Sequence, residues 1–189
     1  TSSIKSSSLN SSEEIINDCI LRVFNTDCNV KKWTNFAKRI VIIGCVPPAE
    51  RKGDIRILPT SSVLICAIKI TVLLVSKIRE TMELRCVDDI VSIAFTAIHM
   101  EKRTIDFHCY SILSSVINCF EDVRNQEGSL LDVYFSQFHP TFSHAFDDGK
   151  RELKSVASFV IAYFKYVESN RKNLIDEVST ILVNGLKKM

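Results

Sequence analysis

Residues 60–78 read TSSVLICAIKITVLLVSKI, and within them only Lys69 and Thr71 interrupt the apolar run 63–75. The hydroxyl side chains at 60–62 suit a helix start, because they can accept hydrogen bonds from the free amides of the first turn. The run is shorter than the roughly 20 residues that span a bilayer, and it carries a central charge. We therefore expect a helix that neighbouring helices enclose on most sides.

The composition of the whole chain also favours helices. Of its 189 residues 46% are hydrophobic, which excludes a disordered chain, and only 5 are Gly and 4 are Pro. A β-sandwich or barrel needs a turn roughly every 8–12 residues, and therefore more Gly and Pro. The net charge of +2 lacks the basic excess of a protein that neutralises many phosphates, so we expect no nucleic-acid partner. Seven Cys without CxxC spacing indicate reduced thiols in a cytoplasmic protein.

Apolar residues recur at helical spacing through most of the chain, which predicts an all-α fold of about eight helices. The expected ranges are 11–25, 29–44, 60–78, 84–98, 104–124, 129–146, 149–168 and 171–187. Two alternatives stay open. The run IVIIG at 40–44 could form a strand before a glycine loop, and His139-Pro140 either kinks the helix over 129–146 or divides it.

The expected helices are arranged as antiparallel pairs in sequence order. Successive pairs begin about 44–49 residues apart, close to the roughly 40–47 residues of HEAT and armadillo repeats. We therefore expect a HEAT/armadillo-like α-solenoid segment over residues 10–189. The Ser-rich residues 1–9 are expected to form a flexible linker, and the Pro-rich residues 45–59 the longest connection.

The first expected helix carries one apolar stripe, formed by Ile15, Ile16, Cys19, Ile20 and Val23. The next helix contains Trp33, the only Trp of the chain, between Lys32 and Phe36. A Trp in such a pattern belongs either to the core or to a surface where it anchors a partner.

The residue types of several catalytic or metal sites occur, but not at the required spacing. His139 and His144 stand five residues apart across a proline, so they do not match a zinc motif. Ser143, His144 and Asp147 lie too close in sequence to form a hydrolytic triad, and no GxSxG or phosphate loop is present. The acidic pairs Asp88-Asp89 and Asp147-Asp148 are read as a solvated helix face and a helix cap. Cys19, Cys66, Cys86, Cys109 and Cys119 are expected to be small core residues. We expect no enzyme activity, no cofactor and no metal.

Short basic clusters are the remaining candidates for a site. With the Trp beside the first of them, the residues of the candidate partner surface are Lys31, Lys32, Trp33, Arg51, Lys52, Lys150 and Arg151. Each cluster holds only a few charges, so a solvated helix face is the competing interpretation.

Several segments follow one another in an order that resembles a known family. They are KKWTNFAKRI at 31–40, PTSSVLICAIKIT at 59–71, VDDIVSIAFTAI at 87–98, DFHCYSILSSVINCF at 106–120 and LDVYFSQFHPTFSHAF at 131–146. The succession is similar to the middle part of the large HEAT-repeat proteins that accompany the adaptor-protein-1 clathrin complex, which include the yeast large adaptor accessory proteins and metazoan relatives. The chain departs from that pattern in the short connection at 45–59.

The resemblance implies a non-enzymatic scaffold segment in clathrin-adaptor-dependent vesicle transport between the trans-Golgi network and endosomes. It implies a cytoplasmic protein, peripheral on Golgi and endosomal membranes, whose membrane association is indirect. Its partners would be proteins: clathrin-adaptor subunits or a small accessory subunit. Self-association through uncovered repeat ends is a further expectation.

Two alternatives to this function stay open. HEAT repeats also build scaffolds for nuclear transport, iron–sulfur delivery and kinase regulation, because fold alone does not define function. A different class would be an all-helical binder of a small ligand near Phe135, His139 and His144.

Overall fold

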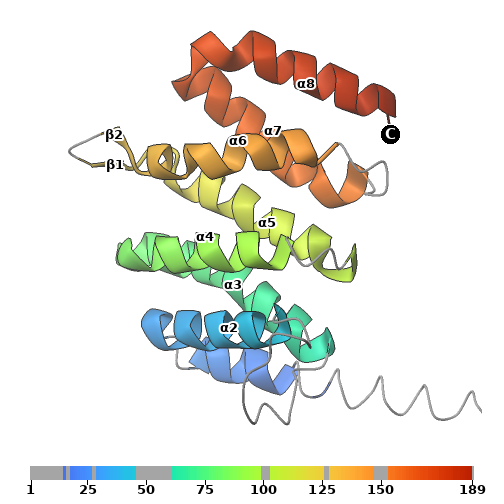
Figure 1. Ribbon diagram of the computed structural model, residues 1–189. Coiled ribbons are helices and arrows are strands. Elements are labelled where there is room, and N and C mark those ends of the chain that lie inside the picture. Colours follow the sequence, from blue (N-terminus) through green and yellow to red (C-terminus); the bar gives the residue numbers. More distant parts are fainter. Residues whose placement is uncertain are drawn as a thin grey trace, which may run out of the picture. The chain divides into compact units, whose positions relative to one another are not determined.

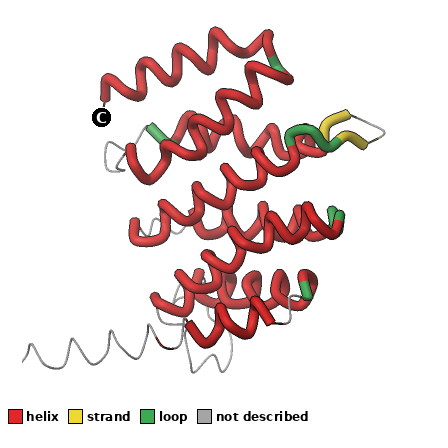
Figure 2. The backbone as a smooth tube through the Cα atoms, turned by 180° about the vertical axis from the view of Figure 1, so that it is seen from behind, coloured by secondary structure: helices red, strands yellow, loops and turns green. Residues whose placement is uncertain are grey.

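Helices form nearly all of the structure, a computed structural model that describes residues 15, 18–26, 29–45, 61–98, 103–125, 128–146 and 153–188 (Figure 1). Helix packs on helix in each part, and the only strands among these residues are two of two residues each (Figure 2). The predicted all-helical class is confirmed. The expected linker at 1–9 and the connection at 46–59 lie outside the described residues.

The chain divides into two compact units, Thr1–Thr96 and Ala97–Met189. The division falls within one helix, α4 (Arg85–Ile98), shortly before its end. Each unit has a set of fully buried apolar side chains of its own, and each is described separately below.

The first unit contains a helix over 18–26, α2 (Val30–Cys45), α3 (Ser61–Thr81) and most of α4. Its central contact is α2 against α3. Both helices place fully buried side chains in this unit: Ala37, Val41, Ile68, Ile70, Leu74 and Ile78. Residues 40–44 are helical, so the alternative of a strand there is wrong.

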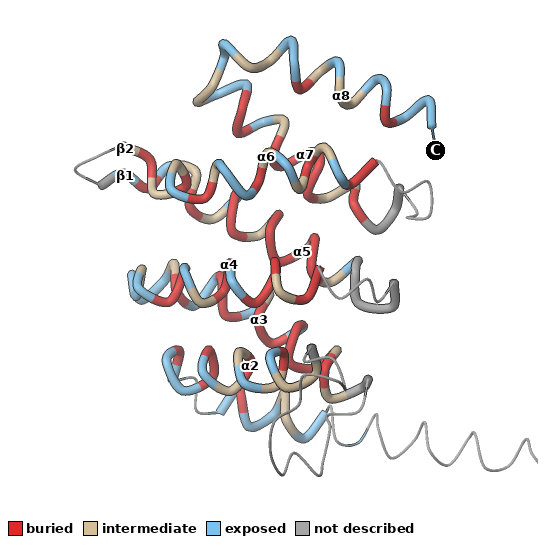
Figure 3. Tube along the Cα trace, in the orientation of Figure 1, coloured by how far each residue is buried: buried red, intermediate tan, exposed pale blue. Residues whose placement is uncertain are grey.

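The apolar helix α3 is buried around much of its circumference, as its sequence predicts (Figure 3). Lys69 keeps its charge at the surface, while Thr71 is buried and donates its hydroxyl hydrogen to the carbonyl of Ala67 at 2.8 Å. A hydroxyl that returns to its own helix needs no partner from the core. Polar residues therefore fit this helix without breaking it.

A short turn joins α3 to α4. Met82 adopts a left-handed conformation with φ of 56°, and its carbonyl accepts from the amide of Leu84 at 2.8 Å. On α4, Asp88 is exposed as predicted, but Asp89 is half-buried and forms an ion pair with Lys38 of α2. The prediction of a purely solvated acidic pair is wrong for Asp89, because tertiary packing brings a lysine of another helix to it.

The second unit consists of α5 (Arg103–Phe120), β1 (Arg124–Asn125), β2 (Gly128–Ser129), η2 (Leu130–Tyr134), α6 (Phe135–His144), α7 (Leu153–Asn170), η3 (Lys172–Leu174) and α8 (Ile175–Lys188). The main contact is α5 against α7, and α6 and α8 also contact α7. Buried aromatic rings fill this unit. Phe142 and Tyr163 have ring centroids 4.9 Å apart, and Tyr110 and Phe159 5.6 Å apart.

The structure corrects two predicted helices in the second unit. Helix α5 ends at Phe120 rather than near 124, because Arg124–Asn125 pairs in antiparallel register with Gly128–Ser129. The segment predicted as one helix over 129–146 changes from 3-10 to α geometry at Phe135 and not at Pro140, which lies inside α6. Ser129 and Asp132 form a capping box that starts η2, so the first break comes from the cap and not from the proline.

Candidate docking groove

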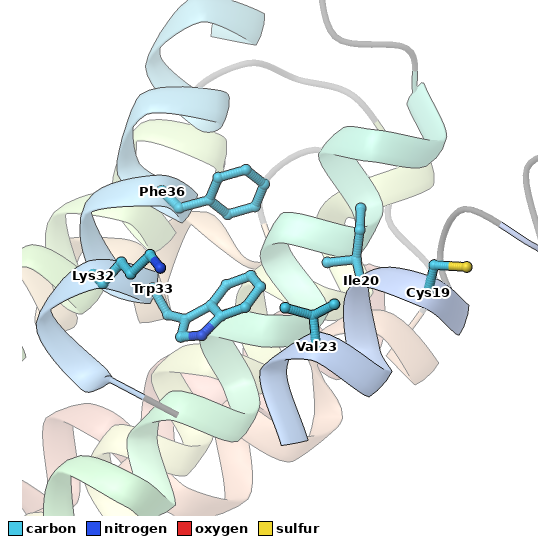
Figure 4. Close-up of a pocket in the computed structure, with 6 residues that line it drawn as sticks. All are labelled: Cys19, Ile20, Val23, Lys32, Trp33 and Phe36. Carbon is cyan, nitrogen blue, oxygen red and sulfur yellow. The ribbon is translucent and has the colours of Figure 1, made fainter. Parts of the chain in front are cut away.

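An apolar groove lies between the helix over 18–26 and α2 in the first unit (Figure 4). Its volume is about 380 Å³. Six residues line it: Cys19, Ile20 and Val23 from the first of these helices, and Lys32, Trp33 and Phe36 from α2. Apart from the lysine, the lining is apolar.

Helical spacing explains why these residues face one another. Positions 19, 20 and 23 lie on one side of their helix, as do positions 32, 33 and 36 of α2. The side chain of Asn29 accepts a hydrogen bond from the amide of Lys32 at 2.9 Å, and this cap begins α2 just before the groove. The groove is therefore built on two regular elements.

Trp33 is largely buried beside this groove, with 9% of its surface exposed. Its ring meets Phe24 edge to face with centroids 5.3 Å apart, and Phe36 in the same way at 5.5 Å. Such aromatic pairs fix the orientation of the ring. The sequence left open whether Trp33 is core or anchor; the ring is part of the core and also lines the groove.

The apolar stripe predicted on the first helix is mostly uncovered among the described residues. Ile15 is 63% exposed and Val23 58% exposed, and Cys19 is exposed as well. Only Phe24 of this helix is buried. The prediction that Cys19 is a core residue is therefore wrong, and Cys119 is only partly buried. Cys66, Cys86 and Cys109 are buried, as predicted.

A second hollow continues from the groove along α2. It is lined by Asn29, Lys31, Lys32, Asn35, Phe36 and Arg39, so it shares Lys32 and Phe36 with the groove. Lys31, Lys32 and Arg39 are exposed, and no carboxylate in the described part of the chain pairs with them. We call these three residues the cationic strip.

Lys31 also lines a third hollow, in which acidic and basic side chains are mixed. This hollow includes Glu83, Arg85, Cys86 and Asp89. Burial, reinforced by the nearby Glu83 carboxylate, raises the pKa of the Cys86 thiol. A thiol with a raised pKa is a poor nucleophile at neutral pH.

The structure places the predicted partner surface only in part. Lys32 and Trp33 line the groove, and the exposed Lys31 lines the adjoining hollow. Arg51, Lys52, Lys150 and Arg151 lie outside the described residues. The sequence did not single out Cys19, Ile20 and Val23 as groove residues. In the sequence these residues appear only as part of an apolar stripe, and a stripe alone does not show whether another element packs on it.

The second unit contains a network of polar and aromatic side chains at α6, α7 and α8. His139 lies 2.8 Å from the hydroxyl of Tyr163 through Nδ1 and 3.3 Å from Glu177 through Nε2. Burial, and then the neighbouring Tyr166 and Glu177, raises the pKa of Tyr163, so its phenol stays protonated and can donate to Nδ1. Both ring nitrogens of His139 are thus engaged within the protein, and His144 is exposed at the end of α6.

Asp132 connects η2 with α7 and with the residue before η3. Its carboxylate accepts hydrogen bonds from Tyr166 at 2.8 Å and Arg171 at 2.7 Å, and from the amide of Ser129 at 3.1 Å. Burial alone would raise the pKa of this carboxyl, but the three donors outweigh it and the pKa lies below its ordinary value. The Arg171 guanidinium also lies 4.7 Å from the ring centroid of Phe135. These contacts hold η2, α7 and the residue before η3 together.

No family model, curated protein or solved structure matches the chain. The site is therefore interpreted from its own geometry. None of the helices, within the part that the structure describes, is both long and apolar enough to cross a membrane. Across the same residues, no three His, Cys, Asp or Glu side chains are grouped so that they could hold a metal ion. The described surface contains an apolar groove beside exposed cations.

Proposed function

We propose that the chain is a non-enzymatic scaffold segment that binds other proteins, built from helical pairs in the manner of HEAT repeats. The groove with its apolar walls and aromatic lining is the observation that supports protein binding most directly. Centres of protein interfaces are depleted in charge and enriched in Trp and Phe, and bulky anchors of a partner dock into such recesses.

Helix packing within each unit is the observation that supports a repeat architecture. In one unit α2 packs mainly against α3, and in the other α5 packs mainly against α7, so the main contacts join helices of successive expected pairs rather than the two helices of one pair. Stacked pairs of this kind present helix faces and loop ends to partners, and they act through shape without chemistry. The resemblance of the sequence to HEAT-repeat accessory proteins supports placing this scaffold in clathrin-adaptor-dependent transport between trans-Golgi network and endosomes, with membrane association through its partners.

A capture experiment tests this function. The 189-residue chain is immobilised and incubated with purified subunits of adaptor-protein-1, and separately with a small accessory subunit of that complex. We expect saturable retention of at least one of these proteins. Retention confined to components of nuclear transport, iron–sulfur delivery or kinase complexes would contradict the transport function, while leaving a scaffold role in place.

A further inference from the structure

We propose that the groove and the cationic strip together bind an acidic amphipathic helix of a partner protein, an inference that rests on the proposed protein-binding function. The apolar face of that helix would lie on Val23 and Phe36, and its carboxylates would meet Lys31, Lys32 and Arg39. Helix-in-groove docking is a recurrent mode of peptide recognition.

The length of the open apolar surface fits this partner. Ile15, Cys19 and Val23 follow one another at four-residue intervals and are all exposed. Within the helix over 18–26, Cys19 and Val23 lie about 6 Å apart along the axis at 1.5 Å per residue, or roughly one helical turn. A partner helix with apolar residues at positions i and i+4 has the same spacing, so two of its anchors can lie beside Cys19 and Val23.

The charge of the groove edge selects an acidic partner. All three residues of the cationic strip are exposed and unpaired in the described part of the chain, and the strip adjoins the groove through Lys32 and Phe36. On the facing helix, Asp18 already pairs with Arg22 at 2.8 Å. Carboxylates of a partner would therefore meet exposed cations that form no ion pair in the described part of the chain, which favours acidic over neutral sequences.

Two other occupants fit less well. In a symmetric dimer formed groove to groove, the cationic strips of both copies would approach each other, and like charges facing each other across an interface are unfavourable. An anionic membrane would also meet Val23 and the cationic strip, but the ring of Trp33, a residue type typical of membrane interfaces, lies recessed between two helices with 9% of its surface exposed.

The only Trp of the chain is a built-in probe, because it lines the groove. The full chain is titrated with a synthetic helix of about four turns that carries Leu and Phe on one face and Glu elsewhere. We expect a saturable change in Trp33 emission and a matching increase in the anisotropy of the labelled peptide. A peptide with Lys in place of every Glu should bind at least about tenfold more weakly.

Two variants of the chain locate the binding. Val23→Asp places a charge on an apolar wall, and the double variant Lys32→Glu with Arg39→Glu reverses the strip. Each should weaken binding about tenfold or more. All three positions are exposed or lie at the groove edge, so circular dichroism should show an unchanged fold.

Matched controls come from the second unit. Ile161→Asp introduces the same charge at a position of α7 that is 56% exposed, against 58% for Val23, and Lys165→Glu reverses an exposed cation of the same helix. Both controls should bind the acidic peptide within about twofold of the unchanged chain. Equal losses in control and groove variants would overturn the proposal.

Three further outcomes would also overturn it: equal affinity for acidic, neutral and basic peptides; a Trp33 signal that depends on protein concentration without peptide, as self-association produces; or stronger binding to vesicles with anionic lipid than to the peptide.

The test also separates the two proposals. Peptide binding at the groove without capture of adaptor subunits contradicts the transport function alone. Adaptor capture that survives both groove variants contradicts the groove assignment alone.

Discussion

Single residues in the second unit show how closely α8 packs. Gly185 is buried, and a Cβ atom at this position would lie 2.3 Å from Cγ and 2.6 Å from Cβ of Phe146. Phe146 is itself buried, with 2% of its surface exposed, so its ring has little room to move. The absence of a side chain at 185 therefore sets how closely α8 can approach.

Replacing Gly185 with Ala should destabilise the protein, although Ala favours helices more than Gly does. The added methyl group must displace Phe146 or α8, and overpacking of this kind costs about 1–3 kcal/mol. Urea denaturation measures the change. The matched control is Asn184→Ala on the exposed side of the same helix, where the effect should stay within about 0.5 kcal/mol. Equal stability of the two variants would show that α8 does not pack as described.

Cysteine reactivity reports on burial residue by residue. Cys19 is exposed, whereas Cys66 and Cys86 are buried, and burial raises the pKa of both buried thiols. A raised pKa leaves less thiolate near pH 8, which slows alkylation in addition to blocking access. Mass spectrometry after brief iodoacetamide treatment should find Cys19 modified first, and the buried pair only after denaturant is added. Early modification of Cys86 would contradict its burial in the core.

At the scale of elements, Asp132 connects three of them. It belongs to η2, and it accepts hydrogen bonds from Tyr166 on α7 and from Arg171 just before η3. Burial, and then the Asp132 carboxylate, raises the pKa of Tyr166 to about 12, so the phenol remains a donor at neutral pH. These hydrogen bonds attach the short element η2 to the long helix α7 and to the start of η3.

The variant Asp132→Asn should lower the free energy of unfolding by about 1–2 kcal/mol at pH 7, because hydrogen bonds to a charged acceptor are stronger than those to an amide. The lowered pKa of Asp132 gives the sign of the pH dependence. Its contribution is complete above the ordinary carboxyl pKa of 3.8 and is lost as the pH falls through the lower value of the folded state.

Urea denaturation at pH 7 and near pH 3 measures this difference. The difference in the free energy of unfolding between the unchanged chain and Asp132→Asn should be smaller at the lower pH. Glu168→Gln, on an exposed position of α7, serves as control and should change stability by no more than about 0.5 kcal/mol. A gap that is the same at both pH values would show that the carboxylate charge contributes nothing.

At the scale of the whole molecule, stability is expected to be uneven within each unit. Helices α3 and α7 carry many fully buried side chains, whereas α8 buries only Val178 and Gly185, and the helix over 18–26 buries only Phe24 (Figure 3). Local opening costs least where few apolar contacts are lost. The groove thus lies beside one of the elements expected to open most readily.

Hydrogen–deuterium exchange followed by mass spectrometry tests this order. Amides of α3 and α7 should exchange slowest in their units, and those of α8 and of residues 18–26 at least about tenfold faster. Addition of the acidic peptide should slow exchange over 18–26 and the start of α2 and leave α8 unchanged. Protection of α8 equal to that of α7 would contradict the burial pattern.

The sequence alone was enough to predict the helices and their approximate order. Hydrophobic periodicity and the scarcity of Gly and Pro are local properties, so α2 and α4 began and ended within a few residues of expectation. The enclosure of α3 was also predictable, because its apolar residues cover more than one face. The errors near 124 and 135 arose where a short hairpin and a capping box outweighed helical spacing.

The groove and the pairing of charges depended on tertiary structure. The apolar stripe that contains Cys19, Ile20 and Val23 and the basic pair Lys31-Lys32 were visible in the sequence, but their juxtaposition requires two helices to be placed side by side. Tertiary structure also decides which cations are paired. Lys38 forms an ion pair with Asp89 of another helix, while Lys32 and Arg39 form none in the described part of the chain. Periodicity shows which residues share a face of one helix; only packing between helices decides whether that face is covered.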